Sequence, residues 1–167
     1  MNAAARYIPQ DSMFLWYLGA PAQPVPVGTL RLLRSLRSVS LQYDAAWLQS
    51  GFALSEDLPL IDSEFLPAQK DSAAGAVDDA RPDRWGERVI RVIHKPERLS
   101  LLEYLYFAGD ERFGALGVSL NAQSYLPHPA GALPALADVQ AIQNLVRRVL
   151  ANEPVAAAQR RLIAPGG

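Results

Sequence analysis

The sequence predicts an α+β fold: a small, mostly antiparallel sheet with helices packed on one face, followed by two C-terminal helices. Two observations support it. Residues 13–43 contain three strand-like segments separated by turn residues, and residues 83–94 and 135–152 show the apolar spacing of amphipathic helices. Consecutive strands with short connections pair as an antiparallel meander that leaves one face wet. A length of 167 residues fits one domain with a small appendage.

The meander is expected to comprise residues 13–18, 27–33 and 38–43. The first segment is aromatic and apolar, and the third alternates polar and apolar residues, which is typical of a half-buried strand. Residues 19–26 contain three prolines and predict a turn or an extended connector. Residues 1–12 show no periodicity and are expected to form a loose arm.

Residues 44–80 carry weaker patterns. Asp44 precedes residues 45–48 and is a favoured N-cap, so a short helix is expected there. Residues 54–60 could hold a short strand. Residues 68–79 are small and polar, and we interpret them as a surface loop.

Two helices are expected at residues 83–94 and 101–108. The first places Trp85 on one face with aliphatic residues four positions apart. The second begins at Ser100, and the glutamate at position 103 completes a capping box, in which side chain and backbone satisfy each other's hydrogen bonds.

The remaining segments complete the predicted fold. Residues 109–111 form a turn, residues 114–120 are expected to rejoin the sheet as a strand, and residues 124–134 are a proline- and glycine-rich linker. A long helix is expected over 135–152, and a short one is expected to open at Pro154. The inward face of the long helix is predicted to contain Val139, Ile142, Val146 and Val149.

Composition excludes several classes of function. The formal net charge is -1, which gives no overall attraction for nucleic acid or membranes. Without cysteine there are no disulfides, thiolate metal ligands or thiol nucleophiles, and a cytoplasmic location is the simplest expectation. Residues 13–22 superficially resemble a signal peptide, but the apolar run is short and Pro9 and Asp11 replace the basic residues that should precede it.

Candidate catalytic groups are few. His94 and His128 share no partner at metal-ligand spacing. The acidic pairs at 78–79 and 110–111 could serve acid–base chemistry or magnesium, but acidic residues in turns and at helix starts more often serve the backbone. No phosphate-binding loop motif is present.

Arginines recur every three residues at Arg31, Arg34 and Arg37, across an expected hairpin. Such a row can bind phosphate or the acidic face of a partner. It can equally form a solvated edge that discourages aggregation between strands. We favour the second interpretation.

Residues 80–90 form the most distinctive segment. Arg81 before a proline is held toward extended geometry, Asp83 favours a helix start, and Trp85 can anchor the helix. Gly86 inside a helix costs about 1 kcal/mol relative to alanine, which indicates that another backbone packs closely there.

Three motifs in this order resemble the N-terminal region of the HipA-type serine/threonine kinase toxins of bacterial toxin–antitoxin systems. The first is Val-Gly-Thr-Leu at 27–30, followed by Leu-Gln-Tyr-Asp-Ala-Ala-Trp-Leu at 41–48. The second is Pro-Asp-Arg-Trp-Gly at 82–86. The third is Gly-Asp-Glu-Arg-Phe-Gly-Ala-Leu at 109–116. The resemblance covers roughly residues 25–167.

The resemblance implies a non-catalytic N-terminal part of such a kinase, which packs on the kinase core and contacts a HipB-like antitoxin. It carries over no catalytic, cofactor or metal residue, and ATP and magnesium are expected only for a kinase core. No direct contact with nucleic acid or membrane is expected. The candidates for the partner interface are Arg81, Asp83, Trp85 and Arg112.

The expected organisation follows from the resemblance. Residues 1–24 are an arm and first strand, residues 25–123 the HipA-like subdomain, residues 124–134 the linker, and residues 135–167 a helical segment. The family's glycine-rich nucleotide loop would begin where the chain ends. We also expect an exposed apolar patch where the outer faces of helices 83–94 and 135–152 lack a kinase core.

Two alternatives stay open. The chain could be a stand-alone inhibitory subunit of a split HipA-type system, although the C-terminal helices exceed what a minimal inhibitor needs. It could also be an unrelated enzyme with an unrecognised site.

Overall fold

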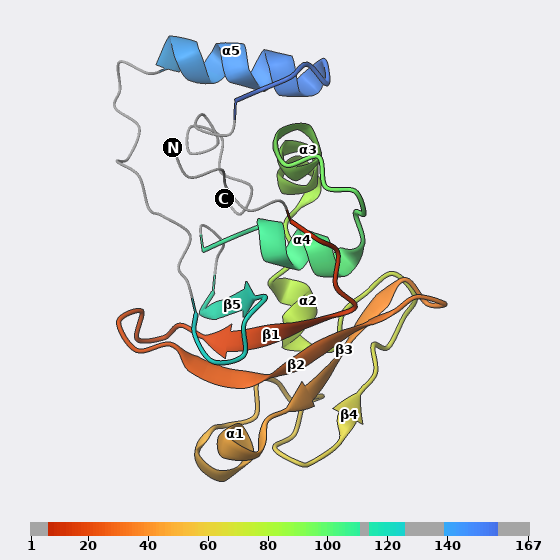
Figure 1. Ribbon diagram of the computed structural model, residues 1–167, viewed down its shortest axis with the longest axis vertical. Helices are drawn as coiled ribbons and strands as arrows, with labels where there is room; N and C mark the ends of the chain where they lie inside the picture. The colour runs from red at the N-terminus through yellow and green to blue at the C-terminus, as the bar shows by residue number, and fades with distance from the viewer. Residues whose placement is uncertain (1–6, 111–113, 126–138, 157–167) are drawn as a thin grey trace.

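A computed structural model describes residues 7–110, 114–125 and 139–156 (Figure 1). Within these residues, five strands form one sheet in the order β4-β3-β2-β1-β5, and every neighbouring pair is antiparallel. The predicted α+β class is confirmed. The strands are β1 (Ser12–Tyr17), β2 (Val25–Leu33), β3 (Ser38–Tyr43), β4 (Glu64–Phe65) and β5 (Leu116–Ser119).

The described helices lie mainly on one side of this sheet. Figure 1 shows α4 close to the sheet, with α3 and then α5 progressively farther from it, and α1 at the opposite end of the molecule. The helix α4 contacts β2, β3 and β5. The helices are α1 (Ala45–Ser50), α2 (Ala76–Asp79), α3 (Arg84–Ile93), α4 (Leu101–Phe107) and α5 (Val139–Leu150).

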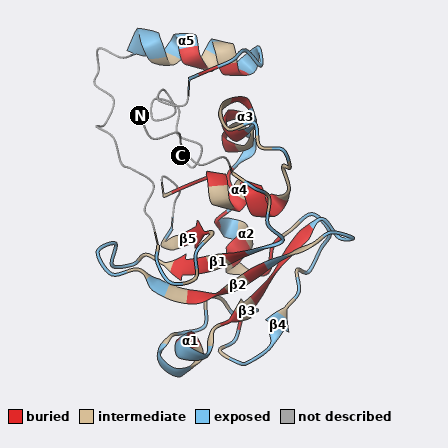
Figure 2. Cartoon of the chain, in the orientation of Figure 1, coloured by how far each residue is buried: buried red, intermediate tan, exposed pale blue. Residues whose placement is uncertain are grey.

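The main core lies between the apolar face of the sheet and α4. Strand register places the side chains of directly opposed residues on the same face, and the opposed pairs include Met13 with Leu30, Leu30 with Leu41, and Leu15 with Val118. Leu102 and Leu105 of α4 join this cluster and are fully buried. Figure 2 shows the burial along β1, β3 and α4.

The other face of the sheet is polar. Arg31 Nη1 donates to Gln42 Oε1 over 2.9 Å, and Ser40 Oγ donates to Glu64 Oε1 over 2.7 Å. This face is polar but not uniformly hydrated: Ser38 and Ser40 of β3 are 0% and 1% exposed, so the strand that the alternating pattern predicts to be half-buried is covered on both faces. Gly28 on β2 lets β3 approach closely, because a Cβ there would lie 2.1 Å from the carbonyl oxygen of Gln42.

The short strand predicted at residues 54–60 is wrong. That segment contains only an isolated bridge between Ser55 and Leu58, and the chain pairs with β3 later, at β4. The physical reason is the phenol of Tyr43. It accepts a hydrogen bond from Leu54 N over 3.1 Å and donates to Leu58 O over 2.8 Å, so the segment folds around the ring.

The surface loop predicted at residues 68–79 is wrong for its second half. Ala73, Ala74 and Val77 are buried in the main core, and α2 begins at Ala76. Ala73 forms a bridge with Val39 of β3. Small side chains here allow the backbone to lie against the sheet, so their low hydrophobicity does not signal exposure.

A second apolar cluster joins α3 to α5. Val89 and Val92 of α3 pack with Leu145 and Val149 of α5, so the two helices bury apolar residues against each other. The apolar patch expected on their outer faces stays a prediction. The predicted inward face of α5 is wrong at Val139, which is 46% exposed, and it omitted Leu145. Residues 154–156 are not helical, and the remainder of the helix predicted from Pro154 lies outside the described residues.

Candidate functional site

The predicted interface residues have different surroundings. Arg81 is exposed and precedes α3. Asp83 caps α3, because its Oδ1 accepts a hydrogen bond from Gly86 N over 2.7 Å. Trp85 is half-buried against the cluster that joins α3 to α5. Arg112 lies outside the described residues. Their part in a partner interface stays a prediction.

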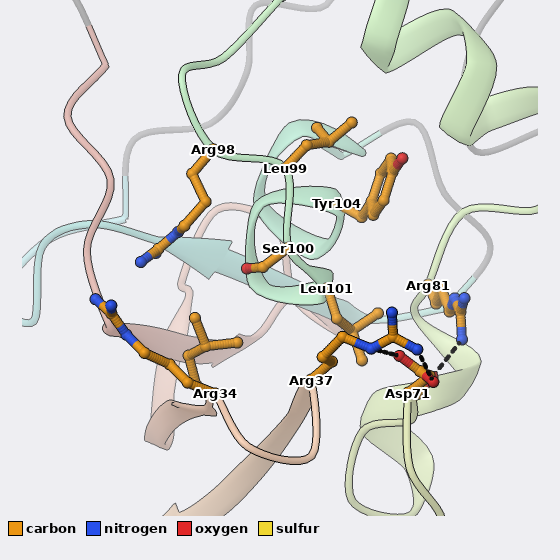
Figure 3. A pocket seen from close by; sticks show the side chains of 10 residues that line it. Arg34, Arg37, Asp71, Arg81, Arg98, Leu99, Ser100, Leu101 and Tyr104 are labelled. Carbon is orange, nitrogen blue, oxygen red and sulfur yellow. Dashed lines mark hydrogen bonds and ion pairs between the residues drawn. The ribbon is translucent and has the colours of Figure 1, made fainter.

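A pocket of about 350 Å³ lies where Arg81 meets the turn between β2 and β3 and the start of α4. Four arginines contribute to it, and Figure 3 shows them gathered from separate parts of the chain. Leucines and a tyrosine ring form much of the remaining wall. The lining residues are Leu32, Arg34, Arg37, Asp71, Arg81, Arg98, Leu99, Ser100, Leu101 and Tyr104.

One end of this arginine-lined pocket is organised by Asp71. Arg37 pairs with its carboxylate through two contacts of 2.7 Å, from Nε and from Nη2. Arg81 Nη1 donates to the carbonyl oxygen of Asp71 over 3.1 Å, and Arg81 Nη2 donates to Glu87 Oε1 over 3.2 Å. Asp71 N in turn donates to Leu36 O over 3.0 Å, which ties the two loops together.

The other end is organised by Asp11, just before β1. Arg34 donates hydrogen bonds to its carboxylate from Nε over 3.0 Å and from Nη2 over 2.8 Å. Arg98 Nη1 donates to the same carboxylate over 2.5 Å. These bonds from Arg98 and Arg34 lower the pKa of Asp11. Two arginines and one carboxylate thus fix the position of the N-terminal segment beside α4.

Glu103 holds Arg98 and Tyr7 in place at the Asp11 end of the pocket. Its side chain is fully buried in α4 and accepts from Arg98 Nη2 over 2.7 Å, Tyr7 Oη over 2.7 Å and Ser100 N over 2.8 Å. Burial by itself would raise the pKa of Glu103, but the hydrogen bonds from Arg98, Ser100 and Tyr7 outweigh it and hold the pKa below its usual range. The predicted capping box is present at Ser100 and Glu103.

Glu103 also changes the pKa values of its partners Arg98 and Tyr7. The hydrogen bond with Glu103 raises the pKa of Arg98, so this guanidinium stays charged. Burial, and then the bond to Glu103, raises the pKa of the Tyr7 phenol. The planar guanidinium groups at the pocket are hydrogen-bond donors whose geometry suits carboxylate or phosphate groups.

Among the described residues, no group of three or more His, Cys, Asp or Glu side chains could hold a metal ion. His94 stacks on Phe107 with ring centroids 4.6 Å apart, and His128 lies outside the described residues. The polar chemistry gathered at the pocket is that of arginines paired with carboxylates.

Sequence reasoning identified only part of this pocket. It singled out Arg34, Arg37 and Arg81, but it placed the first two in one row with Arg31, which lies on the polar face of the sheet. It did not identify Asp71 or Arg98. Their sequence separation from the β2–β3 turn leaves no local signal that could have joined them.

The family model described as the HipA N-terminal domain matches residues 21–119, which is more than half of the chain. No curated protein matches the chain. No helix within the described ranges is long and apolar enough to cross a membrane. On the strength of the family match, the chain belongs to the HipA N-terminal domain family.

Proposed function

We propose that this chain is the non-catalytic N-terminal part of a HipA-type serine/threonine kinase toxin, which packs on the kinase core and contacts an antitoxin. The family match carries the proposal, since it spans β2 to β5 and the helices between them. Phosphoryl transfer requires nucleotide, magnesium and a base held together. We assign that chemistry to the kinase core.

An exposed apolar surface supports association with a partner. Tyr17 pairs with Val25 at the end of β1, and its ring lies 5.2 Å from that of Phe52. Val25 is 41% exposed and Phe52 is 48% exposed. Phe52 is an exposed aromatic side chain beside the half-buried Tyr17, and an exposed aromatic residue next to other apolar groups is a typical anchor of a protein interface. We call Tyr17, Val25 and Phe52 the aromatic patch and propose that it contacts the kinase core.

The test begins with the coding sequence after codon 167 and with the neighbouring gene, which identify the kinase core to be used. The chain and that core, purified separately, are expected to form a complex with a Kd of about 1 µM or lower. Phe52→Asp should weaken binding about tenfold or more, because it places a charge on the aromatic patch. Leu36→Asp is the matched control, since Leu36 is similarly exposed beyond the opposite end of β2.

The outcomes distinguish a toxin subdomain, an inhibitory subunit and an enzyme. If the core lies in the same open reading frame, the chain is a subdomain of the toxin. If the core is a separate gene product and the chain lowers its autophosphorylation, the chain is an inhibitory subunit. A folded chain that fails to bind the core contradicts the proposal, and phosphotransfer by the isolated chain with magnesium and ATP would replace it with an enzymatic function.

A further inference from the structure

We propose that the arginine-lined pocket binds an acidic peptide segment, whose carboxylates pair with Arg34 and Arg37 while its apolar side chains lie against the leucines between them. This inference goes beyond the proposed function and does not require the kinase core. It rests on unused hydrogen-bond donors, on the geometry of the existing ion pairs and on the apolar wall of the pocket.

The unused donors belong to Arg34 and Arg37. A guanidinium group has five N–H donors in a rigid fork. Arg34 uses Nε and Nη2 on Asp11, and Arg37 uses Nε and Nη2 on Asp71. Within the described part of the chain, Nη1 of neither arginine has a hydrogen-bond partner. Their side chains are 72% and 68% exposed, so these donors are open to a ligand.

The existing ion pairs hold the two guanidinium groups in place. Asp11 lies next to β1, where its carbonyl oxygen accepts a hydrogen bond from Leu32 N over 2.8 Å, and Asp71 is tied to the β2–β3 turn. Each carboxylate engages its arginine through two contacts, which fixes the plane of the guanidinium. A ligand carboxylate therefore meets donors that are already oriented, and less side-chain entropy is lost on binding.

The wall of the pocket favours a peptide over a simple anion. Leu32, Leu99 and Leu101 line it together with Tyr104. Figure 3 shows Leu101 near the centre of the pocket and Leu99 and Tyr104 along its upper side, with Arg34 and Arg37 below. Inorganic phosphate gains no binding free energy from an apolar wall. A peptide segment that alternates acidic and apolar residues can bury its apolar side chains against this wall while its carboxylates meet the arginines. The volume is at the low end of the range for ligand pockets, roughly 300–1,000 Å³.

Asp11 limits the affinity of the pocket for acids. Its carboxylate partly neutralises Arg34 and Arg98 and would repel an incoming carboxylate at that end. Removing this charge without changing the shape of the side chain should strengthen the binding of an acidic peptide. Asp11→Asn keeps one acceptor oxygen that can still orient Arg34, and we expect the relief of repulsion to outweigh the weaker orientation. The variant should therefore raise affinity, a result that damage to the fold would not produce.

Binding is measured by fluorescence anisotropy with the full chain and a fluorescein-labelled peptide of alternating leucine and glutamate, at about 50 mM salt, where screening is weak. Saturable binding is expected. Arg37→Ala should weaken it about tenfold, as for loss of a charge-assisted hydrogen bond, and Arg37→Lys should weaken it less because the charge remains. Arg31→Ala is the matched control on the opposite face of the sheet and should leave affinity unchanged.

Several outcomes would overturn the inference. A peptide with glutamine in place of glutamate that binds equally well removes the role of the carboxylates. An equal loss in Arg31→Ala and Arg37→Ala means that only general charge matters. Displacement of the peptide by an equimolar amount of inorganic phosphate identifies a simple anion site, and weaker binding by Asp11→Asn contradicts the assigned role of Asp11. None of these results bears on association with the kinase core.

Discussion

Glu103 joins the N-terminal segment to α4, and among the described residues it is the only fully buried carboxylate. It receives hydrogen bonds from Arg98, Tyr7 and Ser100. Glu103→Gln removes the charge that Arg98 faces and leaves polar groups poorly matched in the interior. We expect the free energy of unfolding to fall by about 3 kcal/mol, measured by urea denaturation with circular dichroism. Glu56→Gln, at an exposed site, should have no measurable effect.

The lowered pKa of Glu103 makes stability depend on pH. Because the folded state binds the proton more weakly than the unfolded chain, the contribution of Glu103 is fully present above the unfolded pKa of about 4.3 and disappears as pH falls through the folded pKa. The thermal midpoints of the wild type and Glu103→Gln should therefore differ most near neutral pH and converge in acid. A difference that persists below both pKa values would show that the loss arises from packing rather than from charge.

At the scale of elements, the N-cap of α3 gives a direct test. Asp83→Ala removes the acceptor for Gly86 N and should lower the free energy of unfolding by about 1 kcal/mol. The urea midpoint measures the change. Asp62→Ala, which alters an exposed aspartate outside the helices, is the control. Equal midpoints for the two variants would contradict the capping role.

Strong local signals made most elements predictable. The capping residues Asp83 and Ser100, the alternation along β3 and the turn glycines each fix a boundary through neighbouring residues alone. The sequence did not predict β4 and α2, which are two and four residues long. Both depend on tertiary contacts rather than on local sequence pattern. The phenol of Tyr43 redirects the chain before β4, and the alanines before α2 are buried because the sheet accepts small side chains.

The pocket was less predictable than the elements around it. Arg34 and Arg37 flank a turn that the sequence predicts, but their partners Asp11 and Asp71 lie in segments without periodic pattern. Arg98 is 87 residues from Asp11 in sequence. Only the packing of α4 on the sheet brings these groups together, so the chemistry of the site follows from the tertiary fold.

At the scale of the whole molecule, α5 attaches through a small cluster on α3. Leu145→Ala removes a buried side chain from that cluster and should cost about 2–5 kcal/mol locally. We expect hydrogen exchange to accelerate over α5 while β1, β2 and β3 stay protected. Leu150→Ala, in which the replaced side chain is 51% exposed, is the matched control. Equal acceleration throughout the sheet would show that α5 and the sheet unfold as one unit.

The pairing of β1 with β5 has a consequence during synthesis. Trp16 and Ser119, which share a hydrogen bond across these strands, are 103 residues apart. A ribosome adding roughly 5–20 residues per second needs roughly 5–20 s to cover that interval. Until β5 emerges, β1 presents an aromatic strand with one unpaired edge, which is a template for pairing with other nascent chains. Slower translation before β5 would prolong this exposure, so we expect it to lower the yield of folded protein.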